Sequence, residues 1–232
     1  MSEDTQPVDT EAHAHAILDE LKRQKLGEPG VYAGRPDILD RVRSYEKHES
    51  EQIQHTISIA SARGEDIEKL ALLDSLTELY NHRTFLKELK AELNRAKRYG
   101  QHVALCMLGI DGMDGIRAHY GTLTVDAVAK VTANVIREGI REVDMAARYS
   151  INEFVLVLPQ TNAAGAALTA ERLRVRCGNQ AINHNWQTFS VTASVGVATF
   201  PQNASAYDEL IARAWEALDY ARARGGDRVF CV

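Results

Sequence analysis

The sequence has no apolar run close to the roughly 20 residues that a membrane-spanning helix requires. Its first residues are acidic and polar, unlike a secretory signal peptide. Basic residues are not in excess either: the net charge is −5 with histidine neutral, which disfavours a non-specific grip on nucleic acid. These absences predict a cytoplasmic protein that neither inserts into a membrane nor binds nucleic acid.

Cysteine is scarce as well. The three cysteines, Cys106, Cys177 and Cys231, are widely spaced and odd in number. This pattern fits neither a disulfide framework nor a metal-binding knuckle. We therefore expect reduced, mostly buried thiols.

The composition that remains is typical of a globular protein, with 45% hydrophobic and 25% charged residues in a chain of 232. This length allows one domain with a sizeable core plus an extension. Residues 1–36 are expected to form a flexible N-terminal segment with a short helix. Residues 37–70 are predicted to form a long, charged, signalling or coiled-coil-like helix.

A thin apolar stripe runs along the predicted helix 37–70, with a polar gap at residues 46–51. Two interpretations of this stripe stay open. The helix packs on its own domain, or it pairs with the same helix of a second chain in a parallel coiled coil. The stripe consists of Leu39, Val42, Ile53, Ile57, Ala60, Ile67 and Leu70.

From about residue 71 the pattern alternates between helix and strand. Strands separated by helices, with one hairpin among them, indicate an α/β fold in which helices cover a sheet. The predicted helices are 84–99, 125–138, 163–177 and 207–224, and the predicted strands are 103–110, 144–149, 153–159, 188–198 and 228–232.

Five segments of residues 71–232, in the right order and spacing, resemble the GGDEF family of diguanylate cyclases and their inactive relatives. The resemblance implies one GGDEF domain over 71–232, with a central, mostly antiparallel, five-stranded sheet covered by helices. The segments are 74–83 (DSLTELYNHR, like DxLTxLxNRR), 108–126, 148–154 (RYSINEF, in place of RYGGDEF), 191–198 (VTASVGVA), and 217–222 (ALDYAR) with 225–229 after it.

The resemblance also implies how an active family member would work. Joining two GTP molecules is phosphoryl transfer, which depends on positioning and on metal ions. The family's two metal-holding acidic positions fall on Gly109 and Asn152, which cannot hold Mg²⁺ as two carboxylates do. Glu153 retains the glutamate of the GGDEF signature. We expect no metal site and no Mg²⁺ cofactor.

Further departures fall in the signature loop and at the nucleotide positions. Ser150 and Ile151 replace two glycines, which would let the chain turn sharply and a ligand approach closely. The family's phosphate-binding Lys falls on Asp114 and its guanine-binding Asn on Arg117, while Asp126 is retained. The sequence therefore predicts a degenerate diguanylate cyclase without catalytic residues.

One family feature is kept. Arg141 and Asp144 form an RxxD motif shortly before the degenerate loop, the place of the family's inhibitory site (I-site) for cyclic di-GMP. An Arg fork can bind or stack on guanine, and an Asp can accept hydrogen bonds from it. By the same resemblance, Arg172 matches a second I-site Arg, and Arg95 a position that reaches the ligand from a neighbouring domain.

These observations predict a cyclic di-GMP receptor. It would form a homodimer and signal to an unidentified protein through its N-terminal helical region. That partner could also recruit it to a membrane or a polar complex. Two alternatives stay open: a ligand-independent dimeric scaffold, and a weak residual cyclase or GTP-binding regulator supported by Asp126 and Glu153.

Overall fold

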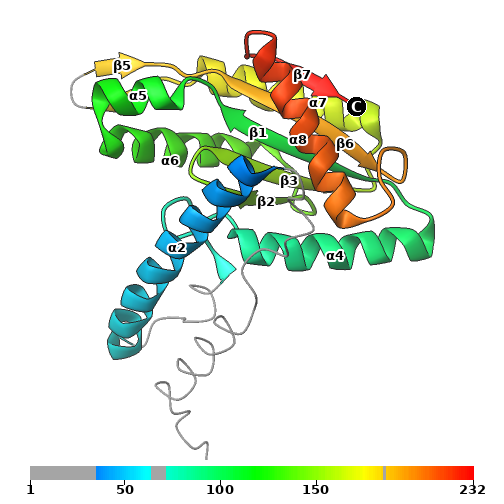
Figure 1. Ribbon diagram of the computed structural model, residues 1–232, viewed down its shortest axis with the longest axis horizontal. Coiled ribbons are helices and arrows are strands. Elements are labelled where there is room, and N and C mark those ends of the chain that lie inside the picture. Colours follow the sequence, from blue (N-terminus) through cyan, green and yellow to red (C-terminus); the bar gives the residue numbers. More distant parts are fainter. Residues whose placement is uncertain (1–34, 64–71, 185–186) are drawn as a thin grey trace, which may run out of the picture.

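The computed structural model describes residues 35–63, 72–184 and 187–232, and its centre is a five-stranded sheet (Figure 1). All neighbouring strands are antiparallel except β6 and β7, which are parallel. The prediction of an α/β fold with a mostly antiparallel five-stranded sheet is confirmed. The strand order is β2 (Met145–Arg148), β3 (Glu153–Pro159), β1 (Val103–Ile110), β6 (Ala193–Phe200) and β7 (Val229–Cys231).

Helices cover both faces of this sheet, so β1 and β6 are buried along their whole length. Alternate residues of β1 point into two separate clusters: Cys106 and Leu108 into one, Leu105 and Met107 into the other. The first cluster includes residues of α6 (Thr122–Gly139) and α7 (Ala163–Asn179). The second includes residues of α2 (Pro36–Arg63), α4 (His82–Tyr99) and α8 (Tyr207–Ala223).

The turn before α4 is fixed by side chains that accept backbone hydrogen bonds. Asn81 caps α4 by accepting from the N–H of Thr84 at 2.9 Å, and Asp74 accepts from the N–H of Thr77 at 2.7 Å. Backbone bonds then join Tyr80 to the edge strand β2, through Ala146 and Arg148. The segment 74–81 is thereby held beside the hairpin formed by β2 and β3.

Two sequence expectations about regular structure were incorrect. The single strand 188–198 is in fact two: β5 (Gln187–Phe189) pairs with β4 (Ile182–His184) in a separate two-stranded sheet, and only β6 joins the main sheet. The chain leaves regular structure between them because Thr192 turns its hydroxyl and its carbonyl toward Asp111. The helix α5 (Met113–Tyr120) was not expected as a separate element.

The first half of α2 packs on its own domain. Ile38, Val42 and Tyr45 are buried in the cluster that contains Phe85 and Trp215. The helix begins at Pro36, one residue before the predicted start, and the structure describes it as far as Arg63. The coiled-coil interpretation stays a prediction, because it depends on positions outside the described side chains: Ile53, Ile57, Ala60, Ile67 and Leu70.

The predicted short helix within residues 1–36 also lies outside the described residues, which begin at residue 35. Among the helices that the structure describes, none combines the length and the apolar character needed to cross a bilayer.

Candidate functional site

Two neighbouring pockets lie at the turn that joins β2 to β3. One has a volume of about 650 Å³ and is lined by residues of α2, α5 and α6 and by the turn at Asp74, and we call it the Asp126 pocket. The other, of about 510 Å³, has Glu153 on its wall, and we call it the Glu153 pocket. Ile151 lines the first and Asn152 the second, so the turn separates the two.

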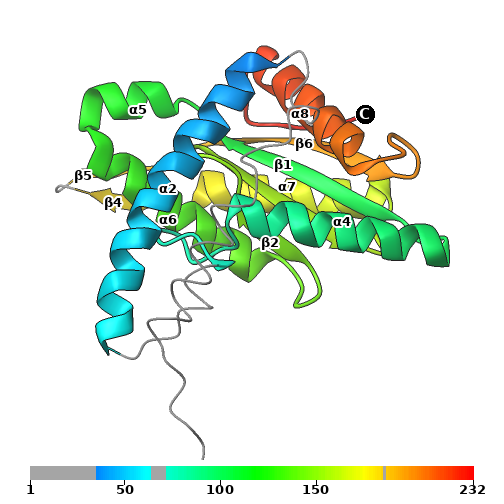
Figure 2. The ribbon, with the colours of Figure 1, turned by 60° about the horizontal axis from the view of Figure 1, so that its bottom comes forward.

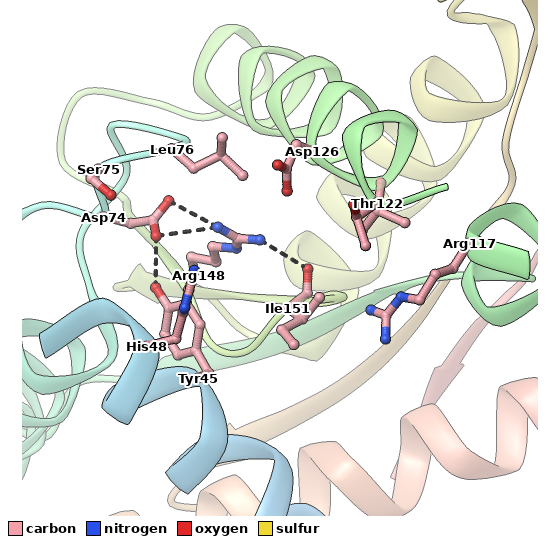
Figure 3. A pocket seen from close by; sticks show the side chains of 11 residues that line it. Tyr45, His48, Asp74, Ser75, Leu76, Arg117, Thr122, Asp126, Arg148 and Ile151 are labelled. Carbon is pink, nitrogen blue, oxygen red and sulfur yellow. Dashed lines mark hydrogen bonds and ion pairs between the residues drawn. The ribbon is translucent and has the colours of Figure 1, made fainter. Parts of the chain in front are cut away.

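Arg148 organises the wall of the Asp126 pocket. Its guanidinium is almost buried, lies 3.3 Å from a carboxylate oxygen of Asp74, and donates to the carbonyl of Ile151 at 3.2 Å (Figure 3). It also donates to the carbonyl of Ser150 at 3.2 Å. The hydroxyl of Tyr45, from α2, donates to the same Asp74 carboxylate at 2.9 Å. These bonds fix the β2–β3 turn against both α2 and the segment before α4.

The other side of the Asp126 pocket carries two of the predicted nucleotide positions. Figure 3 shows Asp126 and Thr122, from α6, and Arg117, from α5, across the pocket from Asp74. The two sides present two guanidinium groups and two carboxylates around one cavity, which suits a polar ligand of moderate size.

The Glu153 side chain is only 1% exposed and accepts several hydrogen bonds. One carboxylate oxygen accepts from Arg41 of α2 at 2.9 Å and from two nitrogens of Arg222, each at 3.2 Å. The other oxygen accepts from the hydroxyl of Ser150. Two guanidinium groups thus neutralise this buried carboxylate.

Gly109, at the end of β1, makes room for this arrangement. A Cβ built on Gly109 would collide with the guanidinium of Arg222. Gly109 offers no side-chain ligand, and both carboxylate oxygens of Glu153 are already bonded, so neither position presents a free carboxylate to a divalent cation. Asp114 lines the same pocket, and the buried side-chain oxygen of Asn152 has no hydrogen-bond partner in the structure.

Asp111, which also lines the Glu153 pocket, uses its carboxylate for hydrogen bonds that connect three segments of the chain. Its carboxylate accepts from the hydroxyls of Thr192 and Ser194 at 2.8 Å and from the N–H of Asp227 at 3.0 Å. Asp111 therefore ties the end of β1 to the start of β6 and to the C-terminal loop.

The RxxD residues form a compact pair away from both pockets. Arg141 donates from Nε and Nη2 to the two carboxylate oxygens of Asp144, at 3.1 and 2.9 Å, and from Nη2 to the hydroxyl of Thr161 at 2.8 Å. Hydrogen bonding to Asp144 raises the pKa of Arg141 above its usual range. The Asp144 side chain is 1% exposed and that of Arg141 is 56% exposed. The buried carboxylate therefore fixes the position of a guanidinium that faces the solvent.

Arg172 reaches the same turn, whereas Arg95 does not. Arg172, on α7, donates to the carbonyl of Gly139 at 2.6 Å, two residues before Arg141. Arg95 lies on α4, over the opposite face of the sheet, where it pairs with Glu92 of its own helix. The helices that carry Arg172 and Arg95 therefore pack on opposite faces of the sheet.

A family profile described as "Diguanylate cyclase, GGDEF domain" matches residues 71–228, which is more than half of the chain. The chain belongs to the GGDEF domain family. Among curated relatives, the diguanylate cyclase DgcP of Pseudomonas aeruginosa is 31% identical over 215 residues, which are 92% of this chain and 31% of DgcP. The chain spans between about a third and a half of the length of the curated relatives it matches.

Solved GGDEF structures share the fold. The GGDEF domain of DgcB from Caulobacter crescentus, solved with c-di-GMP, superposes with a TM-score of 0.67 at 29% identity, over 69% of this chain and 93% of that chain. The diguanylate cyclase SiaD of Pseudomonas aeruginosa, solved with its activator SiaC, also has a TM-score of 0.67, at 28% identity, over 96% of this chain and 79% of that chain.

In this GGDEF domain the predicted active-site positions gather around the two pockets. Asp114, Asn152 and Glu153 line the Glu153 pocket, with Ser150 bonded to Glu153 and Gly109 beside Arg222. Arg117, Asp126 and Ile151 line the Asp126 pocket. Across the described ranges, no cluster of three or more His, Cys, Asp or Glu side chains is placed to hold a metal ion. Sequence reasoning missed Arg41 and Thr161, because neither belongs to a motif.

Proposed function

We propose that this GGDEF domain is a receptor for cyclic di-GMP that binds the dinucleotide at Arg141, Asp144 and Arg172. The observation that carries the proposal is the preformed pair of an exposed Arg141 and a buried Asp144, with Arg172 at the same turn. The solved GGDEF domain of DgcB, which contains c-di-GMP, supports the ligand class.

The chemistry of the pair suits a guanine dinucleotide. Arg141 uses Nε and Nη2 in the bonds to Asp144 and Thr161, and its Nη1 carries two further donors for guanine O6 and N7 or for a phosphate. The Asp144 carboxylate is an acceptor for guanine N–H groups when the pair opens. Arg172 adds a second cation against the two phosphates of the ligand.

We further propose that the domain does not synthesise cyclic di-GMP and needs no Mg²⁺. The supporting observations are the absent side chain at Gly109, the saturation of Glu153 by Arg41, Arg222 and Ser150, and the branched Ile151 in the signature turn. Several curated relatives are named as diguanylate cyclases, so activity must be tested directly.

A homodimer and a protein partner complete the proposal. SiaD, whose match to this chain extends through 96% of it, was solved with its activator SiaC, which supports a partner protein for a chain of this layout. A solved DgcB chain that comprises a coiled coil and a GGDEF domain matches 84% of this chain at a TM-score of 0.68, which supports dimerisation. We place the protein in the cytoplasm, where a partner would recruit it to its site of action.

Calorimetry tests the receptor. We expect cyclic di-GMP to bind the wild type, with about two molecules per domain if the ligand is an intercalated pair, and binding to be lost in Arg141→Ala. The exposed Arg43 of α2 gives a matched control, since Arg43→Ala removes the same charge away from the site. A well-folded wild type that gives no heat would instead favour the ligand-independent scaffold.

A second assay tests catalysis. The protein is incubated with GTP and Mg²⁺ and the nucleotides are separated by chromatography. We expect no more cyclic di-GMP than in a boiled control. Product above that level would establish a residual cyclase, with Asp126 and Glu153 as the first residues to replace.

A further inference from the structure

The helix α2 supplies a wall to both pockets. Arg41 lines the Glu153 pocket, and Tyr45 and His48, one turn and two turns further along, line the Asp126 pocket. Figure 2 shows α2 crossing the domain from its start beside α8, with its far end projecting beyond the other elements. A single helix from outside the family-like segment thus borders both pockets.

Polar contacts fasten α2 at regular intervals to different elements of the domain. Arg35 pairs with Asp219 of α8 at 2.7 Å, just before the helix begins, and Arg41 pairs with Glu153 of β3 at 2.9 Å. The remaining contacts are Tyr45 to Asp74 at 2.9 Å, Glu46 to His82 at 2.7 Å and Ser50 to Arg83 at 2.9 Å.

The apolar part of this contact is small. Among residues 36–48 and 50, the α2 positions whose side chains the structure describes, the buried apolar side chains are Ile38, Val42 and Tyr45, and Leu39 is partly buried. One buried oxygen of Glu46 has no hydrogen-bond partner, which costs stability in the docked state. A helix held by few apolar contacts and several charged ones can leave its domain without unfolding it.

We propose that α2 is a releasable cover over the two pockets and that Arg41 fastens it. With Arg222, Arg41 neutralises Glu153 at the corner where the guanidinium of Arg222 fills the space beside Gly109. When α2 leaves, Glu153 keeps Arg222 and Ser150, so the domain stays folded while both pockets open. This inference is independent of ligand binding at Arg141.

Hydrogen exchange of the full chain, followed by mass spectrometry, tests the cover. In Arg41→Ala we expect amides of residues 36–50 to exchange about tenfold faster than in the wild type, as the loss of one charge-assisted bond predicts. Amides of the contacting turn 150–153 should also exchange faster. Amides of the central strand β1 should not change, because only α2 is released.

Two further variants keep the test decisive. Arg43→Ala removes an exposed arginine from the same helix and should exchange like the wild type. Tyr45→Phe removes only the hydroxyl bonded to Asp74 and should also speed amide exchange in residues 36–50. If Arg41→Ala destabilises the whole domain, so that the amides of β1 also exchange faster, Tyr45→Phe becomes the variant that tests release of α2. Equal exchange in Arg41→Ala and Arg43→Ala, with β1 protected in both, would overturn the proposal.

Discussion

The guanidinium of Arg222 occupies the space above the Cα of Gly109, which any side chain at that position would fill. Arg222 can lie there because it pairs with Glu153, and Glu153 in turn bonds to Ser150 and Arg41. Gly109 and Ser150 are therefore physically linked, since each of them serves the same buried carboxylate.

We expect this link to be measurable in stability. Gly109→Ala should lower the free energy of unfolding by about 1–3 kcal/mol, because the new methyl group displaces Arg222 from Glu153. In an Arg222→Ala background the same substitution should cost much less, since the obstructing guanidinium is gone. Urea unfolding of the four proteins gives the coupling energy, and strictly additive effects would contradict the link.

Thr161 is expected to position Arg141 for the ligand. Its hydroxyl accepts from Arg141 at 2.8 Å and donates to the carbonyl of Pro159 at 2.9 Å. Thr161→Val keeps the shape but removes the acceptor, and we expect cyclic di-GMP affinity to fall about tenfold, while Thr161→Ser should restore it. Calorimetry measures both variants, and equal loss in the two would indicate a packing role instead.

Arg172 and Arg95 should differ in how their effects depend on oligomerisation. Arg172 lies at the turn of its own chain's Arg141, so Arg172→Ala should weaken cyclic di-GMP binding at every protein concentration. Arg95 lies over the other face of the sheet, so Arg95→Ala should matter only where a second chain is present. Titrations at concentrations below and above dimerisation separate the two, and a loss for Arg95→Ala in the monomer would contradict this geometry.

Much of this layout could be predicted from sequence because it depends on local patterns. The strand at 103–110 is an uninterrupted apolar run, and Arg141 and Asp144 meet because they are three residues apart in one turn. Arg41 and Glu153 are separated by 112 positions, and no periodicity reports such a contact. The interruption between β5 and β6 was missed for a similar reason, since Thr192 is bent toward a distant Asp111.

The three thiols should react very differently. Cys106 and Cys177 are buried, and burial raises the pKa of Cys177 to about 11 and that of Cys106 further. Cys231 is exposed in β7, although partial burial raises its pKa too. Because the thiolate is the reactive form, we expect one thiol per chain to react with a disulfide reagent at pH 8 and three after denaturation. Cys231→Ser should abolish the native reaction, and fast labelling of a second thiol would show that the core opens.

Binding of cyclic di-GMP is expected to alter the docking of α2, because only the short strand β2 separates the Arg141–Asp144 pair from the residues that contact α2. β2 begins at Met145, directly after Asp144, and ends at Arg148, which holds Asp74, the partner of Tyr45 in α2. A ligand that opens the Arg141–Asp144 pair should shift this strand and change amide exchange in residues 36–50. The exchange is compared with and without ligand, and Arg141→Ala should abolish the response. If the ligand binds and exchange in α2 stays constant, the site and the cover act independently, and the signal must leave the domain by another surface.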